Sequence, residues 1–87
     1  MNGIQIISPT PDQTISMATI HVVAQANESV AISQIQVWDN GVKLGWYPGA
    51  SVNQYFTLAA GTHTVTVLDL DSNYNVIHRA SVSYSVQ

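Results

Sequence analysis

Apolar and polar residues alternate along most of this chain, and no stretch keeps the 3.6-residue spacing of an amphipathic helix. The alternation is long in two segments, Ala18–Ala26 and Val76–Val86. Successive side chains of a β-strand point to opposite faces of its sheet, so this pattern marks strands with one apolar face. The sequence therefore predicts an all-β protein.

Seven segments have the strand pattern, and residues that favour turns separate them. The expected strands are Ile4–Ile7, Ala18–Ala26, Gln34–Trp38, Val42–Tyr47, Val52–Leu58, Thr62–Leu70 and Val76–Val86. Short strands with turns every 8–12 residues or so are typical of a β-sandwich. No segment offers a crossover helix, which excludes a parallel sheet. We expect a sandwich of two antiparallel sheets with about seven strands.

Two of the turns carry more specific information. Asn40-Gly41 lies between two alternating runs, and this pair suits a two-residue hairpin turn because both positions accept positive φ. Pro9 and Pro11 follow the first strand, and proline removes a backbone donor from a sheet. That segment is therefore predicted to lie at a sheet edge or to switch between sheets.

Length and composition narrow the class of protein. The chain has 87 residues, which suits one domain over residues 1–87. Of these residues 46% are apolar and only 8% are charged, and the net charge is −3. Lys43 and Arg79 are the two cationic side chains. Nucleic acid is a poor partner, because phosphate binding needs several Lys or Arg on one face. No apolar run is long enough for insertion in a membrane.

The sequence also bears on localisation. There is no cysteine, and therefore no disulfide framework or thiolate metal site. Polar uncharged side chains dominate the surface positions, as is common in secreted bacterial β-modules. Met1-Asn2-Gly3 lacks the charged and apolar regions of a signal peptide. We expect a secreted or cell-surface protein whose export signal lies outside this segment.

Three motifs in order resemble the bacterial immunoglobulin-like domain family. The first is Ile7-Ser8-Pro9 followed by Asp12, the second is Ile35–Gly41, and the third is Leu58–Val67 followed by Asp71. The third motif lacks the usual glycine after the aspartate, where Asn73 or Tyr74 stands here. Asn40 replaces the usual aspartate of the hairpin turn, and because asparagine accepts positive φ the turn is retained.

This resemblance implies an immunoglobulin-like sandwich with an accessory, spacer or adhesive role beside enzymes and surface proteins. It implies no reaction, since fold alone does not give function. The expected partners are neighbouring domains of a parent protein, a polysaccharide or another surface protein. The expectation is a protein that is not an enzyme and that uses no cofactor.

The hairpin around Asn40-Gly41 carries the candidate surface. Simple two-residue register pairs Trp38 with Lys43 and predicts one core face and one outer face. The expected core face carries Ile35, Val37, Leu44 and Trp46; the outer face carries Gln34, Gln36, Trp38, Lys43 and Tyr47. The outer residues form a strip suited to stacking on a sugar or docking a partner. Alternatively they are structural, with Lys43 lying across Trp38 as a cation–π pair. Tyr55 is a further candidate for sugar binding.

Other motifs point only weakly to chemistry. Asp71–Asn75 matches the first half of a calcium loop, but Val76 and Val82 stand where Gly and Glu are needed. His21, His63 and His78 fall on separate strands, so no zinc site is expected. His63 is instead predicted to pack at a sheet corner with its N–H bonded to the backbone. No Gly-x-Ser-x-Gly motif is present, and no catalytic residue is assigned.

Overall fold

The computed structural model describes residues 2–87, which form eight strands and no helix. The strands are β1 (Gly3–Ser8), β2 (Thr14–Ile15), β3 (Thr19–Asn27), β4 (Gln34–Asp39), β5 (Val42–Pro48), β6 (Ser51–Thr57), β7 (Gly61–Leu70) and β8 (Val76–Val86). Seven of them match the segments predicted from alternation, and the two-residue β2 is additional. No helix that could cross a membrane occurs in this part of the chain.

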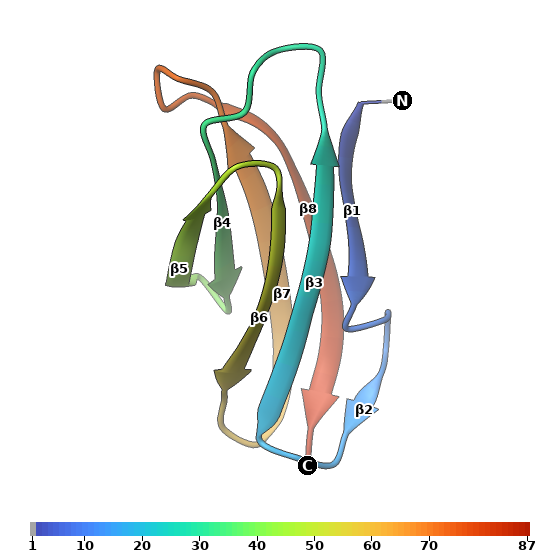
Figure 1. Ribbon diagram of the computed structural model, residues 1–87. Coiled ribbons are helices and arrows are strands. Elements are labelled where there is room, and N and C mark those ends of the chain that lie inside the picture. The colour runs from blue at the N-terminus through green and yellow to red at the C-terminus, as the bar shows by residue number, and fades with distance from the viewer. Residues whose placement is uncertain (1) are drawn as a thin grey trace.

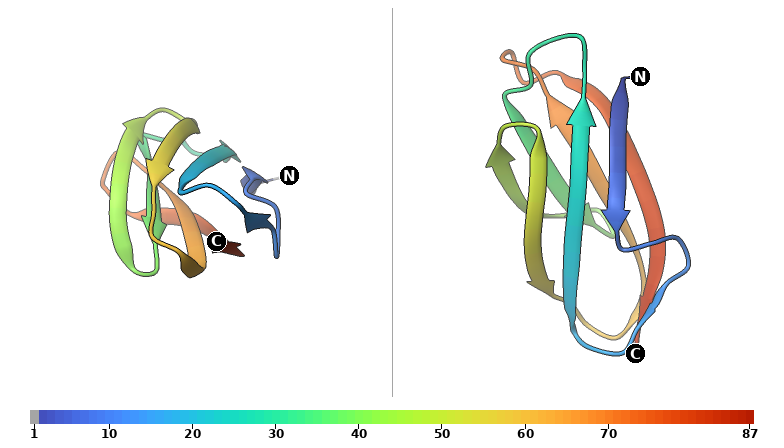
Figure 2. Two further views of the ribbon diagram at one scale, coloured as in Figure 1. Left: turned by 90° about the horizontal axis from the view of Figure 1, so that it is seen from below. Right: turned by 45° about the vertical axis from the view of Figure 1, so that its right-hand side comes forward.

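The strands form two sheets that pack face to face (Figure 1). One sheet has the order β1-β3-β6, and the other has the order β2-β8-β7-β4-β5. The view from below shows the strands arranged in two layers (Figure 2). The predicted all-β, immunoglobulin-like sandwich is confirmed.

The proline segment takes the chain from one sheet to the other. β1 lies at the edge of the three-stranded sheet, and β2 lies at the edge of the five-stranded sheet. The predicted edge and switch are therefore both present. Because the chain does not reverse direction on crossing, β2 pairs with β8 in parallel, through Thr14–Ser85 and Ile15–Val86. Among the pairings of residues 2–87, this short one is the single departure from antiparallel order.

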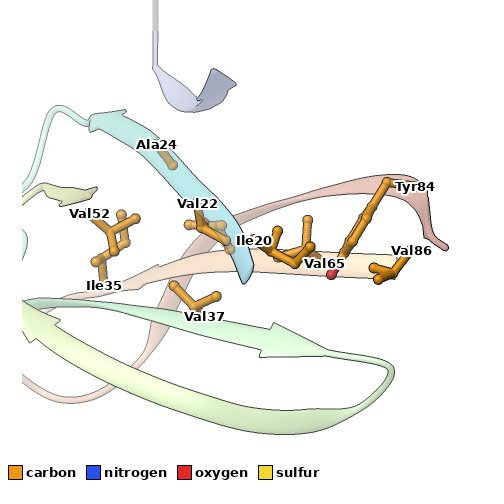
Figure 3. Packing of buried hydrophobic residues seen from close by; sticks show 10 residues of the cluster. Ile20, Val22, Ala24, Ile35, Val37, Val52, Val65, Tyr84 and Val86 are labelled. Carbon is orange, nitrogen blue, oxygen red and sulfur yellow. The ribbon is translucent and has the colours of Figure 1, made fainter. Parts of the chain in front are cut away.

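The core lies between the sheets and is built mainly from branched aliphatic side chains (Figure 3). Its buried members are Ile20, Val22, Ala24, Ile35, Val37, Val52, Val65, Val67, Tyr84 and Val86. β-Branched side chains are stiff and pack well on a pleated surface. The alternate strand positions that face outward then form two exposed sheet faces.

The sandwich is elongated, with extents of 38 × 22 × 18 Å. β1 starts at one end of the long axis and β8 finishes at the other, so the marked N and C ends lie far apart (Figure 1). The β4–β5 hairpin turns at Asn40 and Gly41, which have φ values of 49° and 80°. The predicted positive-φ turn is confirmed.

Candidate functional site

A β-bulge in β5 decides which side chains the hairpin exposes. Asp39 pairs with Val42 and Trp38 with Lys43, as predicted, but Val37 then pairs with Gly45. Leu44 is the extra residue, and it exchanges the two faces of β5 beyond this point. The predicted register is wrong from Leu44 onward. Gly45 was the available signal, since glycine inside a strand often marks a bulge.

The bulge corrects the assignment of two aromatic residues. Trp46 pairs with Gln36 and is 56% exposed, so it is not a core residue. Tyr47 pairs with Ile35, which has no exposed surface, and packs against the core instead of joining the outer strip. Leu44 also packs against the core from the bulge, as expected. The structure thus replaces Tyr47 by Trp46 on the outer side of the hairpin.

Three outward side chains of β4 form a hydrogen-bonded ladder. Trp38 Nε1 donates to Gln36 Oε1 at 3.0 Å, and Gln36 Nε2 donates to Gln34 Oε1 at 2.9 Å. These residues are spaced two apart and share one face of the strand. The ladder fixes the indole and both amides, and it leaves the Gln34 amide N–H groups available for a ligand.

We define the outer face as the outward side of the five-stranded sheet. Its residues are Gln34, Gln36, Trp38, Lys43, Trp46, Thr64, Thr66, Leu68, Arg79, Ser81 and Ser83. The hydroxyls of Thr66 and Ser81 are 2.8 Å apart and hydrogen-bonded. The face therefore presents indoles, amides and hydroxyls together.

Both cationic side chains of the protein lie on the outer face. Lys43 pairs with Trp38, and Arg79 pairs with Leu68. Within residues 2–87, neither cation lies within salt-bridge distance of a carboxylate. Lys43 also makes no ring contact with Trp38, so the predicted cation–π pair does not form.

Tyr55 lies on the other sheet. It pairs with His21, and the two rings stack with centroids 4.2 Å apart and an interplanar angle of 9°. The His21 Nε2 atom lies 2.5 Å from Asn53 Oδ1. The sugar-binding candidate Tyr55 is therefore separated from Trp38 by the full thickness of the sandwich.

A polar cluster at the lower end of the sandwich, where β7 begins and β8 finishes, contains His63, Asp39 and Tyr84. The His63 Nε2 atom lies 2.7 Å from the Ala59 carbonyl, which confirms the predicted backbone bond at a sheet corner. Its Nδ1 atom meets Asp39 Oδ2 at 2.5 Å, while the Tyr84 hydroxyl donates to Asp39 Oδ1 at 2.8 Å. Burial disfavours the charged ring, but Ala59 and Asp39 outweigh it and raise the pKa of His63. Both ring nitrogens face acceptors, so the charged form is favoured.

A second polar cluster at the opposite end joins Glu28, Asp69 and His78. Asp69 has no exposed surface; its Oδ1 accepts the His78 backbone N–H at 2.9 Å. Its Oδ2 receives no hydrogen bond from residues 2–87, and the Glu28 carboxyl interacts with the Asp69 side chain. Burial, and then this contact, raise the pKa of Asp69 to about 6. The same contact, together with His78 and against the effect of burial, lowers the pKa of Glu28. Below about pH 6, Asp69 therefore holds a proton while Glu28 beside it is ionised.

The Asp71–Asn75 segment is a turn stabilised by its own aspartate. Asp71 Oδ1 accepts the backbone N–H groups of Asn73 at 2.9 Å and Asn75 at 3.0 Å. Across the described chain, no group of three or more His, Cys, Asp or Glu side chains is placed to hold a metal ion. His21, His63 and His78 lie in three separate places, as the strand pattern predicted.

Comparison with known proteins gives a family match and several similar structures. The bacterial Ig domain family matches residues 3–67. No match was found among the curated proteins. The fibronectin(III)-like modules of Clostridium thermocellum CbhA match with a TM-score of 0.86 and 18% identity, over 98% of this chain and 97% of theirs.

Two further solved structures share the sandwich. A Jonesia denitrificans lytic polysaccharide monooxygenase matches with a TM-score of 0.66 and 20% identity, over 91% of this chain and 60% of its own. CopC from Methylosinus trichosporium OB3b matches with a TM-score of 0.59 and 13% identity, over 98% of this chain and 94% of its own. At these identities the likeness concerns the fold alone.

Proposed function

This chain belongs to the bacterial Ig domain family, and from that we propose that residues 1–87 serve as one non-catalytic module of a larger extracellular bacterial protein. The similar CbhA structure is itself of modules and matches over nearly the whole of both chains, which supports this proposal. The partners are then the neighbouring domains of the parent protein. The absence of cysteine and the low charge suit a secreted or cell-surface location.

The observation that carries the proposal is the position of the two ends of the sandwich. β1 begins at one end of the 38 Å axis and β8 finishes at the other (Figure 1). Domains attached before β1 and after β8 are held apart by the length of the module. An interaction module with adjacent ends would instead project from its neighbours.

A tandem of two copies joined by a short linker tests the spacer role. Small-angle scattering should give a maximum dimension roughly double that of one copy, whose long axis is 38 Å. A flexible polyglycine linker between the same two copies is the control, and it should give a broader distribution of distances. A compact tandem with side-by-side copies would contradict the spacer role.

The clusters of titratable groups support a non-catalytic role. His63 has both ring nitrogens engaged within the protein, and Asp39 is only 5% exposed. Tyr84 donates its hydroxyl hydrogen inward to Asp39. A general acid or base must instead reach a substrate at hydrogen-bond distance. These groups hold the lower end of the sandwich together.

Carbohydrate binding is the second candidate, and the exposure of Trp46 favours it. Its indole is 56% exposed beside the Gln36 amide, and Trp38 is held on the same face by the ladder. Indole faces stack on the C–H faces of sugars, while amides bond sugar hydroxyls. Affinity electrophoresis through gels that contain neutral or charged polysaccharides tests this role. Trp46→Ala should strongly weaken the retardation of the wild type, and Tyr55→Ala, on the opposite sheet, should preserve it.

A further inference from the structure

We propose that the outer face binds a polysaccharide that carries carboxylate groups, a polyuronate, across strands β8, β7, β4 and β5. In this assignment Lys43 and Arg79 pair with carboxylates, and Trp38 and Trp46 stack on sugar rings. The inference rests on the carbohydrate-binding candidate above and deepens it by naming the ligand class. The charge, the spacing and the chemistry of the face each point to this ligand.

The charge of the outer face is opposite to that of the whole protein. The net charge is −3, yet both Lys43 and Arg79 stand on this one face. Two of the five acids, Asp39 and Asp69, point inward and are buried. The other three lie in loops: Glu28 and Asp71, and Asp12, whose backbone N–H bonds the Ser83 carbonyl at 2.8 Å at the edge of the face away from Arg79 and Lys43. The face therefore attracts anions although the protein is acidic.

The two cations are available to a ligand. Lys43 and Arg79 are exposed, and neither is neutralised by a carboxylate of residues 2–87. An unpaired cation on a surface binds an external anion without first breaking an internal ion pair. Lys43 and Arg79 are the only Lys and Arg of the sequence, so no other Lys or Arg offers an anion a competing site.

The spacing of the cations favours an extended ligand. Arg79 starts a cross-strand row that runs through Leu68 and Gln36 to Trp46. Lys43 finishes the neighbouring row, beside Trp38. Strands lie about 4.8 Å apart, so β8 and β5 are separated by about 14 Å. Two cations on strands this far apart suit a polymer with repeated carboxylates better than one small anion.

The groups between the cations favour a sugar polymer over an acidic peptide. Trp38 and Trp46 are diagonal neighbours across β4 and β5, about 7–8 Å apart. The amide ladder and the Thr66–Ser81 hydroxyl pair lie beside them. A pyranose ring presents a C–H face to an indole and a rim of hydroxyls to amides. An acidic peptide would use the two charges but would leave this arrangement unused.

The test compares ligands that differ only in charge or only in backbone. The probes are polygalacturonate, the same polymer with its carboxylates methyl-esterified, alginate as a second polyuronate, and poly-L-glutamate. Binding is measured by affinity electrophoresis and calorimetry at low and high salt. We expect at least one polyuronate to bind. Methyl esterification of the carboxylates should weaken this binding strongly, and so should about 0.5 M salt, because salt screens the attraction between exposed charges.

Variants of the outer face assign the contacts. Lys43→Gln and Arg79→Gln should each weaken polyuronate binding about threefold to fivefold, the effect of one exposed ion pair. Trp46→Ala should weaken the free and esterified polymers alike, because it removes stacking and not charge. Tyr55→Ala should change none of these affinities. Urea midpoints equal to the wild type for both glutamine variants show that the fold is retained.

Each remaining outcome overturns the inference in a recognisable way. Equal binding of free and esterified polymer overturns the polyuronate assignment and leaves the carbohydrate-binding candidate intact. Poly-L-glutamate binding as tight as polyuronate binding shows attraction by charge alone, as for an acidic peptide. If neither polyuronate binds, the inference fails, and the neutral polysaccharides of the previous experiment decide the candidate function separately.

Discussion

Trp46 lies directly opposite Gln36 across the β4–β5 ladder, because the extra residue Leu44 has moved it from the inner side of the hairpin to the outer side. A single inserted residue exchanges the faces of every position beyond it. The consequence is energetic as well as functional. The large aromatic that fills the inner side is Tyr47, and the one offered to solvent is Trp46.

Truncation of these two neighbours tests the bulge. Trp46→Ala should destabilise by less than about 1 kcal/mol, because the indole is 56% exposed. Tyr47→Ala should destabilise by about 2–3 kcal/mol, since it removes an aromatic ring packed against the core. Urea denaturation of both variants gives the two values. The reverse order would mean that β5 has the simple register without the bulge.

The alternation of β4 predicted its two faces correctly, but the same reasoning failed on β5. Gln34, Gln36 and Trp38 face outward as expected, while Tyr47 does not. Alternation reports which residues share a face only while the strand is regular. Gly45 indicates that β5 contains a bulge, but a glycine alone does not identify which residue is the extra one.

The Glu28–Asp69 pair had no signal in the sequence. Glu28 lies in the loop between β3 and β4, and Asp69 is near the end of β7. Only the folded sandwich brings these carboxyls together, and isolated acids in a sequence are usually solvated. In contrast, the corner role of His63 was predictable, because its position just after Gly61 placed it at the start of a strand.

The hairpin turn supports a second prediction. Gly41 has a φ of 80°, and a Cβ built there meets no atom within 4 Å. Gly41→Val should therefore destabilise by about 1–2 kcal/mol through backbone strain alone. Gly41→Asn is the matched control and should lose clearly less, since asparagine tolerates positive φ. A wild-type urea midpoint for the valine variant would show that this turn does not constrain the fold.

Calcium and zinc should leave the stability unchanged. Asp71 already accepts two backbone N–H groups of its own turn, and residues 2–87 contain no group of ligands placed for a metal. An ion that bound the folded state alone would raise the melting temperature with its concentration. Differential scanning calorimetry with millimolar calcium and with chelator should give the same midpoint. A calcium-dependent rise of several degrees would refute the assignment of this loop as a simple turn.

His63 should make the protein less stable as the solution becomes alkaline. Its pKa is raised in the folded state by Ala59 and Asp39, against the effect of burial. The folded state therefore holds the imidazolium proton more tightly than the unfolded state. The resulting stability is fully present below the unfolded pKa of about 6.5 and is lost as the pH rises through the folded pKa. Urea unfolding from pH 6 to pH 9 should show this loss in the wild type and a flatter profile in His63→Gln. Identical slopes for the two proteins would remove His63 as the cause.

Asp69 should change the stability of the protein in a lower pH window than His63. Removing the charge of this buried carboxyl should stabilise the protein. Its folded pKa is about 6, above the ordinary value of 3.8, so the folded state binds the Asp69 proton more tightly than the unfolded state. This stability is present below about pH 4 and is lost as the pH rises through about 6, where Asp69 ionises beside Glu28. Asp69→Asn cannot ionise. Its carbonyl keeps the His78 N–H, and its amide can donate to Glu28.

The variant should therefore match the wild type near pH 4 and exceed it by about 1–3 kcal/mol at pH 8 in urea unfolding. Glu28 acts in the opposite direction: its lowered pKa gives stability that is lost as the pH falls, and this loss should persist in Asp69→Asn. Glu28→Gln is the matched control: its amide can donate to an ionised Asp69, so it should reduce the step and move it to lower pH, while burial continues to raise the pKa of Asp69. If Asp69→Asn is less stable than the wild type at pH 8, the fold stabilises the ionised Asp69 carboxylate, and the pKa of Asp69 is not raised in the folded state.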